Sequence, residues 1–337
     1  MTQAEESPAT QLLHLLDGFR VAQAIHVAAV LGIADLLEDG PLSSQDLAAA
    51  TDTKAQPLYR LLRALAALGV FREEPDHRFV LTPVGGCLRM TGPHALGPVA
   101  VQDLQPEMWE AWGHLLQSVR TGQNAFRHAH GRDVWEYRAR HPEASAVFDR
   151  SMVARSERDS EAVLAAYDFS RFGTVVDVGG GKGAFLAALL VKHRALEATL
   201  FDQAHVVAGA LAFLQAAGVE ARCQIVSGSF FETVPNGGDA YVLKMVIHDW
   251  TDNEAVSILQ ACRSAMSSDA RLLLIEHVVG APNDGLPAEF FDLQMLVGAG
   301  GQERTRDEFV ELLDAAGFRL VGVTHAGEMS VIEAARR

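Results

Sequence analysis

The pattern of apolar and polar residues divides the chain into two parts. From Gln11 to about Tyr167, apolar residues recur at spacings of three and four, which indicates amphipathic helices. From Thr174 onward, short apolar runs alternate with helical stretches, as in a parallel sheet covered by helices on both faces. The expected strands are residues 174–178, 198–201, 223–227, 239–244, 271–276, 318–324 and 330–335. The sequence therefore predicts a seven-stranded, doubly wound α/β domain after a helical N-terminal part.

The N-terminal part contains a smaller pattern of its own. Ser43 and Asp46 predict a capped short helix, and Pro57 falls in the first turn of the next helix. Residues 71–81 predict two short strands around Pro75. Helix, turn, helix and hairpin in this order form a winged-helix arrangement, which many DNA-binding proteins use.

Two observations argue against DNA as the partner. The helix from Pro57 to Gly69 offers Arg60 and Arg63, but most of its surface is leucine, which favours burial. The chain has 43 acidic and 28 basic residues, and a net charge of −15 repels a phosphate backbone. The apolar surface of residues 12–37 instead predicts a subunit interface and a homodimer, with no nucleic-acid partner.

Other features of the chain set its expected location. Its longest apolar runs are far shorter than the ~20 residues that a membrane helix requires, and the polar start does not resemble a signal peptide. We therefore expect a cytoplasmic protein without a membrane partner. The three cysteines, Cys87, Cys223 and Cys262, are widely spaced and form no Cys-x-x-Cys pair, so we interpret them as small core residues.

The strongest chemical signal is a glycine-rich turn, residues 175–183, between a predicted buried strand and a helix. Glycines allow a ligand to lie against the backbone, and the helix start provides free N–H donors. The spacing Gly179-x-Gly181-x-x-Ala184, with Asp202 ending the next strand, matches the dinucleotide pattern in which the acid binds ribose hydroxyls. An N-cap role is the alternative interpretation of Asp202. A nicotinamide-dependent oxidoreductase remains open on this motif alone.

Asp177 favours a different cofactor. A carboxylate directly before the glycines would repel a pyrophosphate, but it suits a sulfonium or ammonium group. After the third strand of the sheet, Ser229 and Phe230 are candidates to bind an adenine ring. His248 follows the fourth strand, and an imidazole with a pKa near 6.5 can take the proton of a phenol, whose pKa lies near 10. The sequence thus indicates a base beside a cationic cofactor.

Four runs of residues carry a family resemblance: 176–183, 201–207, 244–250 with its His-Asp-Trp, and 300–305. They resemble the small-molecule O-methyltransferases that use S-adenosylmethionine, of the plant caffeic acid type and the bacterial polyketide and phenazine type. The resemblance covers nearly the whole chain. It implies a Rossmann-like class I methyltransferase domain at 168–337, a winged-helix-like dimerisation domain at 1–95, and a helical linker at 96–167 that contributes to the substrate pocket.

The resemblance also implies roles for individual residues. The base would be His248, flanked by Glu276 and Glu303, and the cofactor would contact Gly179, Gly181, Asp202 and Lys244. Many relatives have an aspartate at the position of Ser229, so the adenine contact differs in this chain. A strand-end cap and an ion pair with Arg304 or Arg306 are the alternative roles of the two glutamates.

The implied reaction is methyl transfer from S-adenosylmethionine to a hydroxyl of an aromatic small molecule of the secondary-metabolite type, without a metal. Aromatic and methionine side chains, among them Phe148, Met152 and Met295, would hold the flat acceptor ring, although such residues also build ordinary helix cores. A catalytically silent S-adenosylmethionine-binding protein is a second alternative.

Overall fold

The computed structural model describes residues 7–92, 94–283 and 288–337. It comprises two compact units, one up to Pro106 and one from Glu107 to Arg337. Within the described residues, no helix has the length and apolar character needed to cross a membrane.

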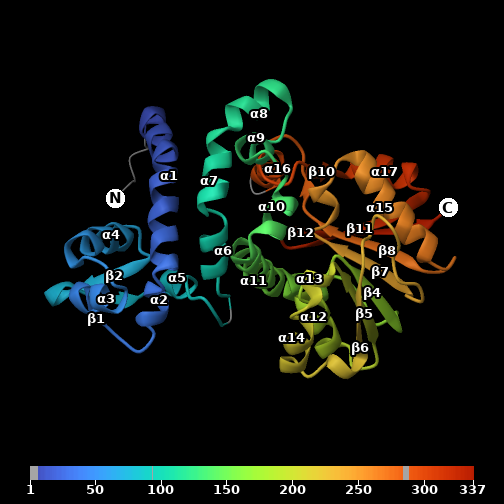
Figure 1. Ribbon diagram of the computed structural model, residues 1–337, viewed down its shortest axis with the longest axis horizontal. Coiled ribbons are helices and arrows are strands. Elements are labelled where there is room, and N and C mark those ends of the chain that lie inside the picture. The colour runs from blue at the N-terminus through green and yellow to red at the C-terminus, as the bar shows by residue number, and fades with distance from the viewer. Residues whose placement is uncertain (1–6, 93, 284–287) are drawn as a thin grey trace. The chain divides into compact units, whose positions relative to one another are not determined.

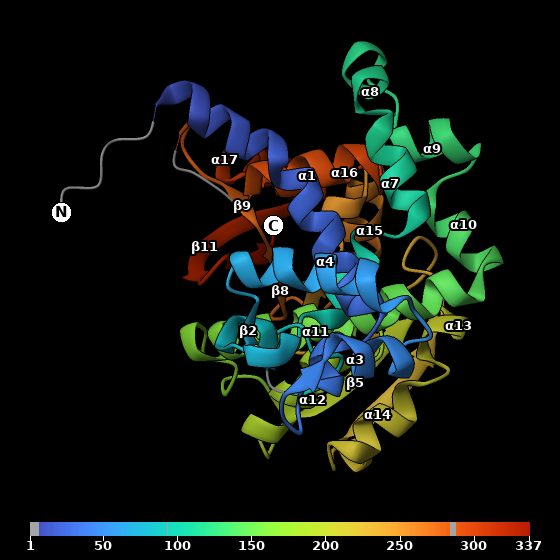
Figure 2. The same cartoon turned by 90° about the vertical axis from the view of Figure 1, so that its left-hand side faces the viewer.

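The long helix α1 (Pro8–Val30) organises the first unit. Its first turn contains Pro8, and the Ser7 side chain accepts a hydrogen bond from the Thr10 N–H. It packs against α2 (Ile33–Leu36), α4 (Ala55–Ala67) and α6 (Gly97–Gln102). The rest of the unit gathers beside the C-terminal half of α1, and the N-terminal half projects beyond it (Figures 1 and 2).

The small predicted elements of this unit are confirmed. Ser43 and Asp46 form a capping box at the start of α3 (Ser44–Ala50), and Pro57 lies in the first turn of α4. The strands β1 (Leu42–Ser43), β3 (Arg78–Leu81) and β2 (Phe71–Glu74) form an antiparallel sheet in that order. A 3₁₀ turn, η1 (Pro75–His77), joins β2 to β3, and α5 (Pro83–Gly86) follows. The predicted burial of α4 is also confirmed, because Leu58, Leu62 and Leu65 lie in the core.

The projecting half of α1 carries apolar side chains that the unit leaves uncovered. Leu12, Leu13, Leu15, Leu16 and Phe19 are each more than half exposed. A continuous run of this kind is typical of a surface that binds another protein.

The second unit contains all seven predicted strands of the large sheet. They are β4 (Thr174–Val178), β5 (Glu197–Asp202), β6 (Cys223–Ser227), β7 (Ala240–Lys244), β8 (Arg271–Glu276), β11 (Phe318–Ala326) and β12 (Met329–Arg336), in the spatial order β11-β12-β8-β7-β4-β5-β6. The predicted sheet is confirmed as a mixed one, because β12 runs antiparallel to both β8 and β11. Only Gly327 and Glu328 separate β11 from β12, and so short a connection forms a hairpin and not a crossover.

Helices cover both faces of this sheet (Figure 1). One face packs against α11 (Pro142–Ala166), α12 (Ala184–Lys192), α13 (Ala204–Val207) and α14 (Ala210–Ala216), and the other against α15 (Asp252–Ala265) and α17 (Arg306–Ala315). Central β4 lies between β5 and β7, where the strand order reverses. Open α/β sheets bind their ligands at this switch point, beyond the C-terminal strand ends.

Five further helices belong with the second unit: α7 (Pro106–Gly113), α8 (Leu115–Thr121), α9 (Ala125–His130), α10 (Val134–Arg140) and α16 (Ala288–Val297). A separate apolar cluster around Met108, Phe126 and Val297 holds several of them together. Helix α11 packs against α12, β11 and β12. The three-part division with boundaries at 95 and 167 stays a prediction.

Candidate active site

The glycine turn after β4 is held in place by Asp202. Gly181 N–H donates to Asp202 Oδ2 at 2.9 Å, and Gln203 N–H donates to Oδ1 at 2.6 Å. Gly179 and Gly181 have φ values of +75° and +61°, which residues other than glycine rarely adopt. Gln203, and not Asp202, is the N-cap of α13. Asp202 therefore lies at the C-terminal end of β5, with Oδ2 anchored on the glycine turn and Oδ1 on the N–H of Gln203.

Asp177 lies beneath the same turn. A Cβ on Gly180 would lie 2.5 Å from Asp177 Oδ2, so only glycine lets the turn pass over this carboxylate. Asp177 is 1% exposed, and neither of its oxygens accepts a hydrogen bond from the described residues. Burial and the charge of Asp202 together raise the pKa of Asp177 to about 7, against the opposing effect of Lys244. A buried carboxylate without a partner indicates a place for a cationic ligand group.

Lys244 is the last residue of β7, and its ammonium group interacts with several acidic side chains. Its ammonium lies 3.8 Å from Asp159 on α11, and its side chain is 7% exposed. Burial lowers the pKa of Lys244, while Asp159, Asp177 and Glu276 act in the opposite direction. The predicted cofactor residues Gly179, Gly181, Asp202 and Lys244 thus lie at the C-terminal strand ends.

After Lys244 the chain makes a sharp turn that seats Glu276. Met245 has a φ of +54°, an uncommon value for a residue with a long side chain. This left-handed residue followed by right-handed Val246 directs successive N–H groups to one point. Val246 and Ile247 N–H both donate to Glu276 Oε1, at 3.1 and 2.8 Å. Glu276 therefore caps the N–H groups of the segment that follows β7. A capping role was the alternative to a place beside His248.

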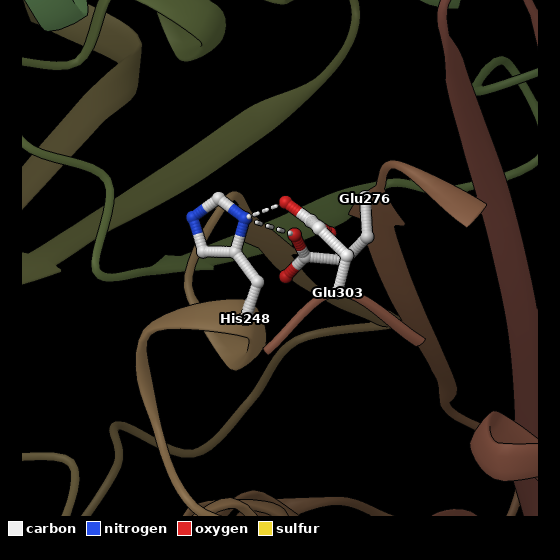
Figure 3. Close-up of side chains that lie close together, drawn as sticks. All are labelled: His248, Glu276 and Glu303. Carbon is white, nitrogen blue, oxygen red and sulfur yellow. Dashed lines mark hydrogen bonds and ion pairs between the residues drawn. The ribbon is translucent and has the colours of Figure 1, made fainter. Parts of the chain in front are cut away.

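The three predicted catalytic residues come together (Figure 3). His248 lies in the 3₁₀ turn η3 (Ile247–Asp249), and its Nδ1 is 2.7 Å from Glu303 Oε1 and 3.5 Å from Glu276 Oε2. A carboxylate can only accept, so Nδ1 carries the proton in this contact and Nε2 is the nitrogen left for an acceptor group. Asp249 Oδ1 lies 3.7 Å from Nε2. His248, Glu276 and Glu303 are all buried.

A two-stranded sheet brings the glutamates together across the sequence. The strands β9 (Val278–Val279) and β10 (Arg304–Thr305) are parallel, with Arg304 opposite Val278. Glu303 directly precedes β10, and its N–H donates to Asp292 Oδ1 at 3.0 Å. This short pairing sets the position of Glu303 beside the end of β8.

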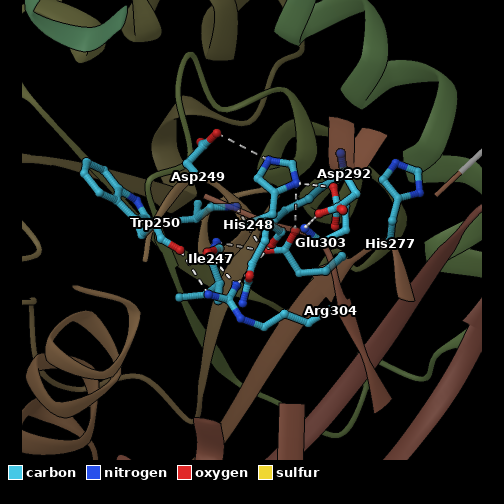
Figure 4. A network of polar contacts seen from close by, with 12 residues as sticks. Ile247, His248, Asp249, Trp250, His277, Asp292, Glu303 and Arg304 are labelled. Carbon is cyan, nitrogen blue, oxygen red and sulfur yellow. Dashed lines mark hydrogen bonds and ion pairs between the residues drawn. The ribbon is translucent and has the colours of Figure 1, made fainter. Parts of the chain in front are cut away.

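Arg304 then clamps the histidine turn (Figure 4). Its guanidinium is 1% exposed and donates to the Ile247 and Trp250 carbonyls at 3.1 and 3.0 Å, and to Asp252 at 2.8 Å. Arg304 therefore pairs with Asp252, and the alternative surface ion pair between Glu303 and Arg304 is wrong. Sequence reasoning missed this clamp, although the run that carries Glu303 also carries the arginine.

The surroundings change the acid–base character of His248. Burial lowers its pKa, but the charges of Glu303, Glu276 and Asp249 outweigh burial and raise the pKa to about 10. The expected ordinary value near 6.5 is wrong for this reason. Burial raises the pKa of Glu276 to about 7 against the effect of His248. The cluster therefore holds on to protons much more strongly than an isolated histidine.

The same three side chains could in principle hold a metal ion. Ligands on a tetrahedral zinc lie about 2.0–2.2 Å from the metal, which places neighbouring ligand atoms roughly 3.3 Å apart. The Nδ1 to Oε1 distance of 2.7 Å is that of a hydrogen bond. This arrangement favours a shared proton over a bound metal.

Aromatic side chains border the turn that carries His248. Phe230 Cε1 would lie 3.6 Å from a Cβ on Gly179, and the Phe230 ring meets Trp250 edge-on at 5.8 Å. Ser229 Oγ accepts a bond from Phe231 N–H at 3.3 Å. Trp250, for which the sequence predicts no separate role, thus packs edge-on against Phe230.

The predicted acceptor residues lie on two helices. Phe148 and Met152 are one turn apart on α11, both partly buried, and Met295 is buried on α16. The Phe148 ring meets Trp135 edge-on at 5.8 Å. Their assignment to an acceptor pocket stays a prediction.

Comparison with known proteins agrees with this geometry. Residues 112–319 match an O-methyltransferase domain model, and residues 13–91 match an O-methyltransferase dimerisation domain model. The phenazine O-methyltransferase PhzM of Lysobacter antibioticus is 41% identical over 96% of this chain and 95% of the relative. The crystal structure of LaPhzM is 40% identical, with a TM-score of 0.95 over 98% of this chain and 100% of the other.

One solved relative has two small molecules bound. It is the O-methyltransferase NcsB1 from neocarzinostatin biosynthesis, in complex with S-adenosylmethionine and 2-hydroxy-5-methyl naphthoic acid. It is 35% identical to this chain, with a TM-score of 0.80 over 94% of this chain and 96% of the other.

The close approach of the chain to His248 generates a stability prediction. A Cβ on Gly301 would lie 2.0 Å from the His248 carbonyl oxygen, which is backbone and cannot rotate away. We expect Gly301→Ala to lower the free energy of unfolding by about 1–3 kcal/mol. Gly322→Ala is the control, because nothing lies within 4 Å of its Cβ position. Urea unfolding measures both, and equal midpoints for the two variants would contradict the prediction.

Proposed function

The chain belongs to the S-adenosylmethionine-dependent O-methyltransferases with an N-terminal dimerisation domain, and on that premise we propose that it methylates an aromatic hydroxyl with His248 as general base. The observation that carries the proposal is the hydrogen bond from His248 Nδ1 to Glu303 at 2.7 Å. This bond fixes the ring and leaves Nε2 to take the proton of the acceptor.

The residues around the glycine turn fit the cofactor. Asp177, with two buried oxygens that accept no bond from the described residues, suits the ammonium or sulfonium of S-adenosylmethionine. When bound, the cofactor supplies an electrophilic methyl group. Asp202 would hold the ribose hydroxyls. The remaining contacts that we propose are Gly179, Gly181, Ser229, Phe230 and Lys244.

His248 and its acids handle the proton. A phenol has a pKa near 10, and the His248 pKa of about 10 makes transfer of that proton to Nε2 nearly balanced in energy. Glu303 holds the ring in its tautomer and stabilises the imidazolium after transfer. Glu276, seated on two backbone N–H groups, adds a second negative charge on the Nδ1 side. This acid–base step contributes roughly 10²–10⁴-fold to the rate.

We propose that the acceptor ring packs against Phe148, Met152 and Met295. Support comes from their places on α11 and α16, and from the flat aromatic ligand named for NcsB1. We also retain the proposed division into a dimerisation part at 1–95, a linker at 96–167 that contributes to the pocket, and a cofactor-binding part at 168–337. The homodimer is part of the same proposal.

One alternative makes a different prediction: a catalytically silent protein would bind S-adenosylhomocysteine but leave every aromatic hydroxyl unmethylated. The nicotinamide-dependent oxidoreductase that the glycine motif left open is wrong, because residues 112–319 match an O-methyltransferase domain model. Asp177 agrees with this, because it would face a pyrophosphate with a buried negative charge.

The first test removes the base. We expect His248→Ala to lower turnover of an aromatic hydroxyl acceptor by at least 10²-fold, since the proton then has no acceptor. Calorimetric binding of S-adenosylhomocysteine should be unchanged, because His248 lies outside the glycine turn. His325→Ala, an exposed histidine on β11, is the matched control and should retain full turnover. Near-normal turnover in His248→Ala would remove His248 from this role.

The second test follows the pH dependence. A pKa of about 10 keeps His248 protonated below that pH, so kcat/KM should rise as the pH increases into the alkaline range. Glu303→Gln removes a charge that raises this pKa, and the rising limb should move to lower pH while the maximum rate falls. Rate profiles of both proteins measure the shift. An unmoved limb would show that Glu303 does not control the base.

The third test concerns the dimer. Replacing Leu15 and Leu16 together by glutamate places two charges on the exposed apolar half of α1, which should convert the dimer to monomer. Light scattering after size-exclusion chromatography measures the mass. Val191→Glu, a similarly exposed position on α12, is the control and should remain dimeric. A double variant with unchanged mass would place the interface elsewhere.

A further inference from the structure

The side chain of Arg138, on α10 of the second unit, packs against two aromatic rings. Its guanidinium carbon lies 3.5 Å from the centre of the Phe148 ring and 5.0 Å from the Trp135 ring. Two rings fix the position of the cation, which is planar and stacks well on aromatic faces.

This guanidinium has aromatic neighbours but no anion. Among the described residues, none accepts a hydrogen bond from Arg138 or forms an ion pair with it. Burial lowers its pKa to about 10, so it stays charged at neutral pH. The neighbouring Trp135 indole N–H is buried and likewise donates to none of the described residues. Arg138 itself is half-buried, but the Trp135 N–H is an unpaired buried donor, and such donors are rare and usually indicate a ligand or a solvent molecule.

A second stacked arginine has a carboxylate partner in addition to its aromatic rings. Arg171 lies over the rings of Tyr167 and Phe172, at 5.1 and 4.8 Å, and its guanidinium also pairs with Glu333 at 2.7 Å. The buried Arg304 is likewise paired, with Asp252. Arg138 contacts two aromatic rings, but among the described residues it has no carboxylate partner.

The position of Arg138 is close to the proposed chemistry. Trp135 stacks on Trp250 with ring centres 6.1 Å apart and planes at 21°, and Trp250 follows His248 and Asp249 directly. Asp249 is the acid that attracts Arg138 most strongly, and it lies 3.7 Å from His248 Nε2. Arg138 is therefore linked to the histidine turn through Trp135, which stacks on Trp250.

We propose that Arg138 binds a carboxylate on the aromatic acceptor, so that the natural substrate is a hydroxyaryl carboxylate. The inference rests on the proposed function and names its substrate class. The guanidinium fork matches the two oxygens of a carboxylate, while Phe148 holds the plane of the cation. In a site where Asp249, Glu276 and Glu303 are all acidic, this cation also offsets the repulsion that an anionic acceptor would meet.

The test uses a matched pair of acceptors, a hydroxynaphthoate and the naphthol without its carboxylate. We expect the intact protein to methylate the hydroxynaphthoate with at least about tenfold higher kcat/KM, and Arg138→Gln to lower that value about 10- to 100-fold, mainly through KM. The naphthol should change less than about threefold. Arg138→Lys, which keeps the charge but loses the fork, should fall between the two. Arg171→Gln is the control arginine and should leave the ratio of the two acceptors unchanged.

Two results would overturn the proposal: equal kcat/KM for both acceptors with the intact protein, or an equal loss for both in Arg138→Gln. Failure of the proposed function is distinct, because then the protein binds S-adenosylhomocysteine but methylates neither acceptor. In that case, calorimetric titration of both acceptors into the S-adenosylhomocysteine complex still decides the role of Arg138. Tighter binding of the hydroxynaphthoate that Arg138→Gln abolishes supports it, and equal binding of both acceptors contradicts it.

Discussion

The site depends on the hydrogen bond between His248 Nδ1 and Glu303, because the imidazole and the carboxylate that it joins are both buried away from water. Two buried carboxylates beside one imidazole are costly to desolvate, and only a shared proton and fixed donors compensate that cost. The surrounding structure supplies them: two backbone N–H groups seat Glu276, β9 and β10 align Glu303, and Arg304 holds the carbonyls of the histidine turn.

The acids of the second unit form two groups with different tasks. Asp177 and Asp202 lie at the ends of β4 and β5, where Asp202 is anchored and Asp177 is left without a partner. Glu276 and Glu303 lie beyond β8 and before β10, where they act on His248. Lys244 interacts electrostatically with one acid of each group, because Asp177 and Glu276 both act to raise its pKa.

The sequence predicted these strands well because each is a short apolar run bounded by turn residues, and it predicted the glycine turn because only glycine allows its backbone angles. It could not show that β12 reverses direction, since the alternation of apolar residues carries no strand direction. The pKa of His248 and the clamp by Arg304 also escaped prediction. Both depend on residues 30 to 57 positions apart, which only tertiary structure brings within hydrogen-bond reach.

The chemistry and the proposed recognition rest on different parts of the fold. The base and its acids lie at strand ends of a sheet that packs on both faces, so their geometry tolerates little change. Phe148, Trp135 and Arg138 instead lie on α10 and α11, where a side chain can change without moving β7 or β8. Specificity for an acceptor can therefore vary by substitution on the helices while proton transfer is preserved. Arg138, which packs on two aromatic rings and has no ion pair among the described residues, is therefore informative about the substrate.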